Sequence, residues 1–303
     1  MRIVVTGRNG QVAHAIRSLT DESAEIISLA RPTLDLAQPA TILPALASAA
    51  PDVIINAAAY TAVDQAENES ELAFAVNATG AKTIAEAAEH LGIPLVHLST
   101  DYVFDGSLGR PYIEADPTSP LGVYGCSKEA GEVAIGRSGL NYVILRTAWV
   151  YSPTGRNFLS TMLRLANERP VVRVVADQFG APTYAMDVAL GAILVARRLV
   201  DDSDKAVRGI FHMTAAGQAS WADFAEAIFA ESAARNGPAA RVERVSTDEY
   251  ASPTRRPADA RLDCSRFAAA FGWTLPHWRT HIAEAVEACL KLDTTKEDER
   301  MLS

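Results

Sequence analysis

The feature of this sequence that most constrains its fold is a glycine turn directly after the first apolar segment. The β-forming run Arg2–Thr6 is followed at once by Gly7 and Gly10, and residues from Asn9 to Leu19 have a helical pattern. In a strand–turn–helix unit, Gly7 allows the tight turn, and Gly10 lets the backbone approach a pyrophosphate at the helix N-terminus. This order predicts a dinucleotide-binding α/β unit, with an ordinary glycine turn as the alternative.

β-rich runs and helical stretches alternate through the first half of the chain. Strands are expected at residues 2–6, 25–29, 53–56, 95–99 and 142–146, and helices at 9–19, 40–50, 69–91 and 124–137. Such alternation predicts an α/β fold with a Rossmann-type, doubly wound parallel sheet. We assign residues 1–150 to this dinucleotide-binding Rossmann domain, completed by about residues 185–215. Residues 151–184 and 216–303 are expected to form a smaller C-terminal substrate-binding lobe over the carboxyl ends of the strands.

Charge and composition argue against several classes of partner. The 303 residues have a formal net charge of −9 and no lysine-rich block, which argues against nucleic-acid binding. No apolar run approaches the roughly 18 residues of a membrane span, and the N-terminus has no secretory pattern. The three cysteines, Cys126, Cys264 and Cys289, are far apart and form no metal-binding pattern. We therefore expect reduced thiols in a cytoplasmic protein.

The end of the second expected strand indicates which nicotinamide cofactor fits. Enzymes that prefer NAD usually place Asp or Glu there to bind the ribose hydroxyls, whereas this chain has Ala30 and Arg31. Arg31 can form charge-assisted hydrogen bonds with a 2′-phosphate, and Arg8 in the glycine turn can assist. The sequence therefore favours NADPH and leaves NADH open. An exposed loop arginine without a ligand is the alternative for Arg31.

A tyrosine and a lysine four residues apart give the main catalytic signal. Tyr124 and Lys128 share one face of the expected helix. A cation there favours the phenolate and lowers the tyrosine pKa from its reference of about 10, and such a tyrosine can protonate a carbonyl oxygen as hydride reaches the carbon. Thr100 ends the strand at the same edge of the sheet, where its hydroxyl can bind the substrate oxygen. We expect these three residues to act together, and we assign no role to His97.

These features resemble the extended short-chain dehydrogenases, and further motifs resemble the dTDP-4-dehydrorhamnose reductases. The most specific motif is Ser-Thr-Asp-Tyr-Val-Phe-Asp-Gly at residues 99–106. The other matching segments are residues 10–12, 56–64, 146–151, 177–183 and 256–258. The resemblance covers nearly the whole chain. It implies NADPH-dependent reduction of dTDP-4-dehydro-L-rhamnose to dTDP-L-rhamnose, the last step of activated rhamnose synthesis.

The resemblance also implies a role for each matching residue. Tyr124 would donate the proton while hydride passes from the nicotinamide to the sugar C4, Lys128 would hold the nicotinamide ribose, and Thr100 would complete the catalytic triad. Tyr124 and Lys128 are expected to contact the cofactor as well. The other residues expected there, besides Gly7 and Arg31, are Gly10, Gln11 and Val12 at the pyrophosphate, Asp35 and Leu36 at the adenine end, and Ala59, Tyr60, Thr61 and Leu98 at the nicotinamide half. The residues expected at the substrate are Thr100, Asp101 and Trp149. A core aromatic for Trp149, a turn cap for Asp101 and a buried strand residue for Leu98 are the alternatives.

Two departures from the family pattern limit what the resemblance implies. Some relatives are thought to dimerise through magnesium held by acidic side chains, but this chain has Ala15 at one such position and no Asp or Glu in residues 9–19. We therefore expect no metal, and a homodimer stays open. Asp259 stands where the family often has Asn, which leaves a reductase or epimerase of another nucleotide-linked 4-keto-sugar open. A non-catalytic NADP-binding regulatory subunit is the remaining alternative, and the intact triad argues against it.

Overall fold

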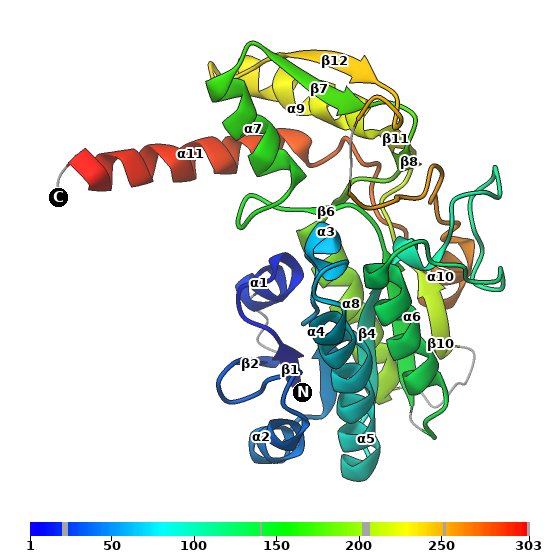
Figure 1. Ribbon diagram of the computed structural model, residues 1–303. Helices are drawn as coiled ribbons and strands as arrows, with labels where there is room; N and C mark the ends of the chain where they lie inside the picture. Colours follow the sequence, from blue (N-terminus) through cyan, green and yellow to red (C-terminus); the bar gives the residue numbers. More distant parts are fainter. Residues whose placement is uncertain (20–23, 140, 202–206, 251–252, 302–303) are drawn as a thin grey trace.

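A six-stranded parallel sheet forms the centre of the larger part of the protein. The computed structural model describes residues 1–19, 24–139, 141–201, 207–250 and 253–301 (Figure 1). The sheet order is β10-β5-β4-β3-β1-β2, with the strands β1 (Arg2–Thr6), β2 (Glu25–Leu29), β3 (Val53–Asn56), β4 (Leu95–Thr100), β5 (Tyr142–Thr147) and β10 (Gly209–His212). Because β2 lies on one side of β1 and the later strands lie on the other, the winding direction reverses between β1 and β3. This arrangement confirms the predicted doubly wound, Rossmann-type α/β fold, in which ligands bind at the reversal point.

Helices cover both faces of this sheet. Alternate strand residues point to opposite faces, so that Val5 and Ile55 join one core while Val4 and Ile54 join another. The helices of the first core are α1 (Gln11–Ser18), α8 (Ala185–Asp201) and α10 (Ser265–Phe271), and those of the second core are α2 (Ile42–Ala49), α5 (Ala81–Leu91) and α6 (Val123–Gly136). The strands are therefore buried on both sides, as their continuous apolar sequences predict.

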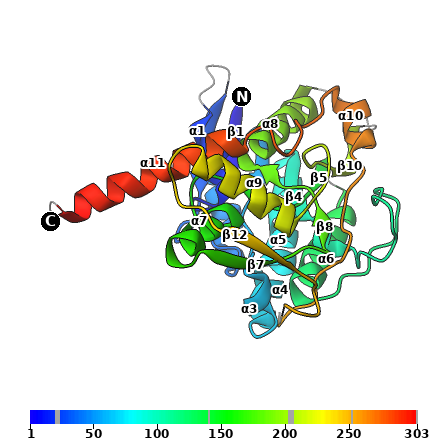
Figure 2. The same ribbon diagram turned by 90° about the horizontal axis from the view of Figure 1, so that it is seen from above.

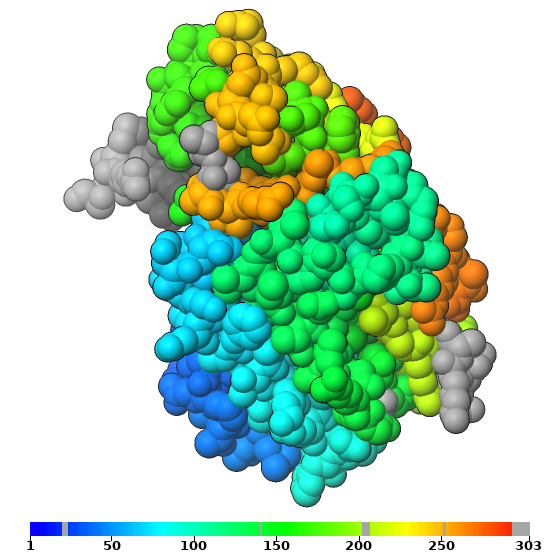
Figure 3. Space-filling view, turned by 45° about the vertical axis from the view of Figure 1, so that its right-hand side comes forward, coloured from blue at the N-terminus to red at the C-terminus, as the bar shows by residue number. Residues whose placement is uncertain are grey.

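A smaller lobe stands over the carboxyl ends of the strands (Figures 1 and 2). Its elements are β6 (Val150–Tyr151), α7 (Phe158–Glu168), β7 (Val171–Val175), β8 (Phe179–Gly180), β9 (Thr183–Tyr184), β11 (Ala219–Ser220), α9 (Trp221–Ala233), β12 (Arg241–Val245) and α11 (Ile282–Met301). The lobe has its own core, in which Phe224 and Ile228 of α9 pack with Trp278. An orange segment around residues 253–264 crosses between this lobe and the larger body (Figure 3). It is joined to both by bridges from Asp259 to Phe179 and from Leu262 to Tyr112.

The helix expected at residues 69–91 is divided into three parts, so that prediction is wrong in its middle. The parts are α4 (Ser70–Phe74), a π-helical turn η2 (Ala75–Gly80) and α5, and a short helix α3 (Val63–Ala66) precedes them. At Gly80 a Cβ atom would lie 2.6 Å from the carbonyl oxygen of Leu36, so the helix can approach that loop only with a glycine there. π-helical turns often occur at functional sites, and this one lies beside the cleft described below. Among the described helices, none is long and apolar enough to cross a membrane.

Candidate active site

A cleft of about 890 Å³ opens at the carboxyl end of the sheet. Every residue that the sequence predicts for cofactor, substrate or catalysis lines it: Gly7, Gly10, Gln11, Val12, Arg31, Asp35, Leu36, Ala59, Tyr60, Thr61, Leu98, Thr100, Asp101, Tyr124, Lys128 and Trp149. The sheet brings these residues together because the ends of β1, β3, β4 and β5 meet at one edge. The contact of each residue with a ligand stays a prediction.

The glycine turn leaves an open approach to the N-terminus of α1. Gly7 has a φ of +92°, which favours glycine, and a Cβ there would lie 3.4 Å from the Cβ of Ala58. A Cβ at Gly10 would meet nothing within 4 Å, so the backbone there faces open space. Gly10 is also the N-cap of α1, with no side-chain cap and no acidic residue in the first turn. The free N–H groups and the positive end of the helix dipole therefore suit a phosphate group.

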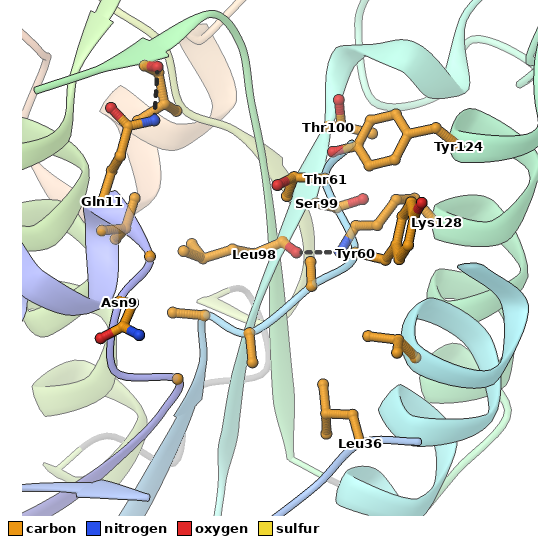
Figure 4. A pocket seen from close by; sticks show the side chains of 18 of the residues that line it. Asn9, Gln11, Leu36, Tyr60, Thr61, Leu98, Ser99, Thr100, Tyr124 and Lys128 are labelled. Carbon is orange, nitrogen blue, oxygen red and sulfur yellow. Dashed lines mark hydrogen bonds between the residues drawn. The ribbon is translucent and has the colours of Figure 1, made fainter. Parts of the chain in front are cut away.

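Two of the predicted cofactor residues also hold the local structure. Gln11 joins α1 to the segment that follows β5, because its Nε2 donates to the Val150 carbonyl (3.1 Å) and its Oε1 accepts from Ser152 (3.0 Å) (Figure 4). The carboxylate of Asp35 accepts a hydrogen bond from the backbone N–H of Ala37 (3.0 Å), which shapes the loop after β2. Arg31 is exposed and lines the cleft close to this loop.

Sequence reasoning missed the residue that fixes the loop after β3. Asn77 is buried in the π-helical turn, where its Oδ1 accepts from the Tyr60 N–H (2.8 Å) and its Nδ2 donates to the Tyr60 carbonyl (3.0 Å). The same Nδ2 lies 3.0 Å from Ser127 Oγ on α6. Asn77 therefore sets the position of Tyr60 relative to the helix that carries Tyr124. An asparagine inside an apparently continuous helix gave no sign of this contact.

Tyr124 lies beside Thr100 at the end of β4 (Figure 4). Burial raises the pKa of Tyr124 to about 12, while the hydrogen bond with the Thr100 hydroxyl lowers it and the carboxyl of Asp101 raises it. The net shift is opposite to the lowering expected from Lys128. The phenol therefore holds its proton at neutral pH, as a proton donor must.

The surroundings of the Lys128 amino group explain why Lys128 does not lower the pKa of Tyr124 as expected. Its Nζ donates to the carbonyl of Leu98 (2.7 Å; dashed in Figure 4) and lies 3.3 Å from His97 Nε2. Burial lowers the pKa of Lys128 to about 8, and the nearby Glu132 raises it. A lysine whose charge is destabilised by burial favours a neighbouring phenolate less than a fully charged one does.

Asp101 presents a polar atom that has no partner in the described part of the chain. The carboxyl is 1% exposed, its Oδ1 accepts from the Thr100 hydroxyl (3.0 Å), and its Oδ2 is buried without a hydrogen bond. Burial raises the pKa of Asp101 to about 7, against weaker lowering effects that include the hydrogen bond from Thr100. A buried polar atom at the wall of a cleft suits a hydroxyl group on a ligand.

We predict that Asp101→Asn removes a pH-dependent loss of stability. The native carboxyl keeps its proton up to about pH 7, whereas the unfolded one loses it near 3.8. The wild type is therefore stabilised at low pH, and that contribution disappears as the pH rises through 7. Urea unfolding across this range should show the variant gaining stability relative to the wild type up to about pH 7. A constant difference at all pH values would mean that folding does not raise the pKa of Asp101.

The far wall of the cleft contains residues that the sequence did not single out. Trp149 stacks on Trp221, the first residue of α9, with ring centroids 3.5 Å apart and an angle of 8°. Trp149 has a φ of +47°, an uncommon backbone conformation for a large side chain, and a Cβ at Gly180 would lie 2.5 Å from its ring. Arg156, in the loop before α7, also lines the cleft. Trp221 is distant in sequence from every recognised motif, and Arg156 lies just outside the segment 146–151, so neither belongs to a recognised motif.

The described residues show neither a metal-binding group nor a disulfide at this cleft. They contain no cluster of three or more His, Cys, Asp or Glu side chains that could hold a metal ion. Cys126, Cys264 and Cys289 are thiols that form no disulfide among the described residues.

Comparison with known proteins identifies the family. Residues 1–291 match the family described as RmlD substrate binding domain. The chain is 47% identical over 290 residues to a dTDP-4-dehydrorhamnose reductase of Sinorhizobium fredii, covering 96% of this chain and 98% of the relative. It is 43% identical to the enzyme of that name from Burkholderia thailandensis, covering 96% and 99%. The crystal structure of a dTDP-4-dehydrorhamnose reductase from Bacillus anthracis in complex with NADP superposes with a TM-score of 0.85 at 34% identity, covering 94% of this chain and 98% of that one.

These matches span both the sheet domain and the smaller lobe, and they agree with the motifs gathered at the cleft. On this evidence the chain belongs to the dTDP-4-dehydrorhamnose reductase family.

Proposed function

We propose that this protein reduces the C4 ketone of dTDP-4-dehydro-L-rhamnose to the alcohol of dTDP-L-rhamnose, with NADPH as the reductant. The observation that carries this proposal is the meeting of Thr100, Tyr124 and Lys128 with the glycine turn in one cleft. A proton donor and a dinucleotide-binding turn on the same cleft are what reduction of a carbonyl requires. The family names and the NADP complex of the Bacillus anthracis relative support the same reaction.

The residues around the glycine turn fit a dinucleotide. The uncapped N-terminus of α1 and the open space at Gly10 suit the pyrophosphate, and Arg31 suits a 2′-phosphate. When bound, the reduced nicotinamide would supply a hydride. Lys128 would orient the ribose next to the nicotinamide, because Leu98 and His97 engage its amino group and leave a further hydrogen for the cleft.

Tyr124 would serve as the general acid. Its high pKa means that a proton is available at neutral pH, and it would pass to the C4 oxygen as negative charge develops there. Thr100 would donate a hydrogen bond to the same oxygen after its hydroxyl turns from Asp101 Oδ1 toward the substrate. Asp101 Oδ2 has no partner within the described residues, and it would form a hydrogen bond with a sugar hydroxyl, which can donate to a carboxylate or accept from a protonated carboxyl.

We further propose a division of labour between the two parts of the chain. Residues 1–150, with about residues 185–215, would hold the cofactor, since the sheet and its turns come from these segments. Residues 151–184 and 216–303 would hold the rest of the substrate. Trp149, stacked on Trp221, would form the wall against which that substrate lies.

Oxidation of NADPH, followed by its absorbance, tests the proposed reaction against a small panel of nucleotide-linked 4-keto-sugars. We expect the highest kcat/KM with dTDP-4-dehydro-L-rhamnose. A higher kcat/KM with another 4-keto-sugar would reassign the substrate. Binding of NADPH without oxidation by any of them would support a regulatory subunit instead.

We predict that Arg31→Asp weakens NADPH binding by about 1–3 kcal/mol, the range of a hydrogen bond to a charged group. Binding of NADH should stay near normal, because NADH has no 2′-phosphate for Arg31 to contact. Dissociation constants for both cofactors, measured by fluorescence titration, make the comparison. Arg137→Asp is the matched control, since Arg137 is exposed and does not line the cleft. Equal weakening of NADPH and NADH would show that Arg31 does not contact the phosphate.

A further inference from the structure

A chain of buried polar side chains leads from the strand before the glycine turn to Lys128. Thr6 Oγ1 donates to Asn56 Oδ1 at 2.6 Å, and Asn56 Nδ2 lies 2.9 Å from His97 Nδ1. On its other side, His97 Nε2 lies 3.3 Å from Lys128 Nζ. The four residues come from β1, β3, β4 and α6, and each is at most 2% exposed. Because Thr6, Asn56 and His97 are shut off from water, the direction of each hydrogen bond in this chain constrains the direction of the next one.

The hydrogen bonds of this chain, taken in order from Thr6 to Lys128, favour the amine form of Lys128. Thr6 Oγ1 accepts from the Ala58 N–H (3.2 Å) and donates to the oxygen of Asn56, whose Nδ2 then donates to His97 Nδ1. A neutral imidazole carries one hydrogen, so that hydrogen is on Nε2 and points at Lys128. Only an amine has a lone pair that can accept it.

The ammonium form of Lys128 requires the opposite arrangement. An ammonium group only donates, and one of its hydrogens goes to the carbonyl of Leu98 (2.7 Å). His97 Nε2 must then accept, and its hydrogen must be on Nδ1. Asn56 would turn its amide over so that its oxygen faces the ring, and the Thr6 hydroxyl can accept from the turned amide because it has two lone pairs.

The imidazole stays neutral in both arrangements. Burial and the charge of Lys128 hold the pKa of His97 well below its usual range. The group that titrates is therefore Lys128, whose pKa of about 8 reflects burial first and then the opposing effect of Glu132, which is itself paired with Arg146 on β5 (2.6 Å). The other titratable groups that line this side of the cleft are Asp101, Tyr60, Tyr102 and Tyr124. The charged side chains of α3, α4 and α5, which pack near α6, are exposed to solvent.

We infer that His97 is a positioning residue for Lys128, a neutral imidazole whose tautomer follows the protonation state of the lysine, with Asn56 as its adapting partner. In the ammonium state, His97 and Leu98 take two of the three Lys128 hydrogens and direct the third toward the cleft. The hydrogen-bond chain itself does not depend on the substrate. Only the effect of His97 on catalysis, through the Lys128 hydrogen that faces the cleft, rests on the proposed function.

Nitrogen-15 NMR of the full-length protein, labelled in the histidine rings, tests this inference without substrate. Across a pH titration through 8, we expect the hydrogen of His97 to move from Nδ1 to Nε2 as Lys128 loses its proton. Absence of the His97 signals in His97→Gln assigns them. A single tautomer throughout, or a positively charged His97 ring, would overturn the inference.

His212 is an internal control in the same spectra. It is also buried beside a cation, with Nδ1 at 3.0 Å from the carbonyl of Tyr112 and Nε2 at 3.5 Å from Arg146. A carbonyl only accepts and arginine keeps its charge, so His212 should keep its hydrogen on Nδ1 throughout. In Lys128→Met the tautomer change of His97 should disappear, while the His212 signals report that the fold is intact. A change that persists in Lys128→Met would contradict the assigned cause.

The pH profile of kcat/KM tests separately whether His97 supports the ammonium form of Lys128 during catalysis. His97→Leu removes an acceptor from the ammonium, so the alkaline limb of the kcat/KM profile should move to lower pH by about one unit, the effect of one hydrogen bond to a charged group. His97→Gln, whose amide can accept or donate, should restore most of the wild-type limb. An unchanged limb in His97→Leu would contradict the positioning role. Failure of every 4-keto-sugar to react would overturn the proposed function and leave the NMR result to decide the inference.

Discussion

Replacement of Tyr124 by phenylalanine should lower kcat by about 10²–10⁴, the usual contribution of a general acid. The variant keeps the ring that packs at 5.6 Å against Tyr102 and loses only the hydroxyl beside Thr100. Without that hydroxyl, no proton is in place when negative charge develops on the substrate oxygen. Steady-state kinetics at saturating NADPH give the change in kcat.

Two comparisons isolate the chemical step in that experiment. The dissociation constant for NADPH should stay near its wild-type value, because the glycine turn and Arg31 are unaffected. Tyr142→Phe is a matched control, since Tyr142 begins β5 at the opposite end of the sheet and does not line the cleft. Wild-type turnover in Tyr124→Phe would exclude this tyrosine as the proton donor.

The largest expected effect on stability comes from the ion pair beneath the site. Arg146 and Glu132 are each 3% exposed in their side chains and 2.6 Å apart, and the carboxylate also accepts from Ser99. Glu132→Leu would leave the guanidinium of Arg146 buried without its counter-charge. We expect the free energy of unfolding in urea to fall by about 3–5 kcal/mol, the usual cost of removing one partner of a buried pair.

An exposed pair provides the control for this measurement. Arg164 and Glu168 are bonded on α7 with side-chain exposures of 61% and 46%. Glu168→Leu should therefore change the free energy of unfolding by about 0–1 kcal/mol. Similar losses in the two variants would show that burial does not determine the strength of the Arg146–Glu132 pair.

The sequence predicted the sheet and much of the cleft lining because those features are local. Each of these motifs, the glycine turn after β1, the strand end at Thr100 and the Tyr124–Lys128 pair, spans only a few residues. The alternation of strands and helices then places the three motifs at one edge of the sheet. The C-terminal end of α5 followed from a local signal too. Gly92 ends α5 in the left-handed conformation with a φ of +69°, as its position before Pro94 predicts.

The features that sequence analysis missed depend on contacts between distant segments. The π-helical turn arises where Gly80 meets the loop containing Leu36, and Asn77 acts on Tyr60, 17 residues earlier. Trp221 is far from any motif in sequence and reaches the cleft because α9 belongs to the lobe above the sheet. The pKa of Tyr124 was expected to fall, but it rises because burial outweighs the charge of a lysine that is itself desolvated. Burial is a property of the fold, and residue spacing alone does not predict it.

The most direct test of the account follows the hydride itself. The protein is supplied with dTDP-4-dehydro-L-rhamnose and with NADPH that carries deuterium at both positions of the nicotinamide C4, and the product is analysed by NMR. Direct hydride transfer should place one deuterium at C4 of the rhamnose ring and none at any other carbon. A product with no deuterium at C4, or with deuterium at a different carbon, would contradict it.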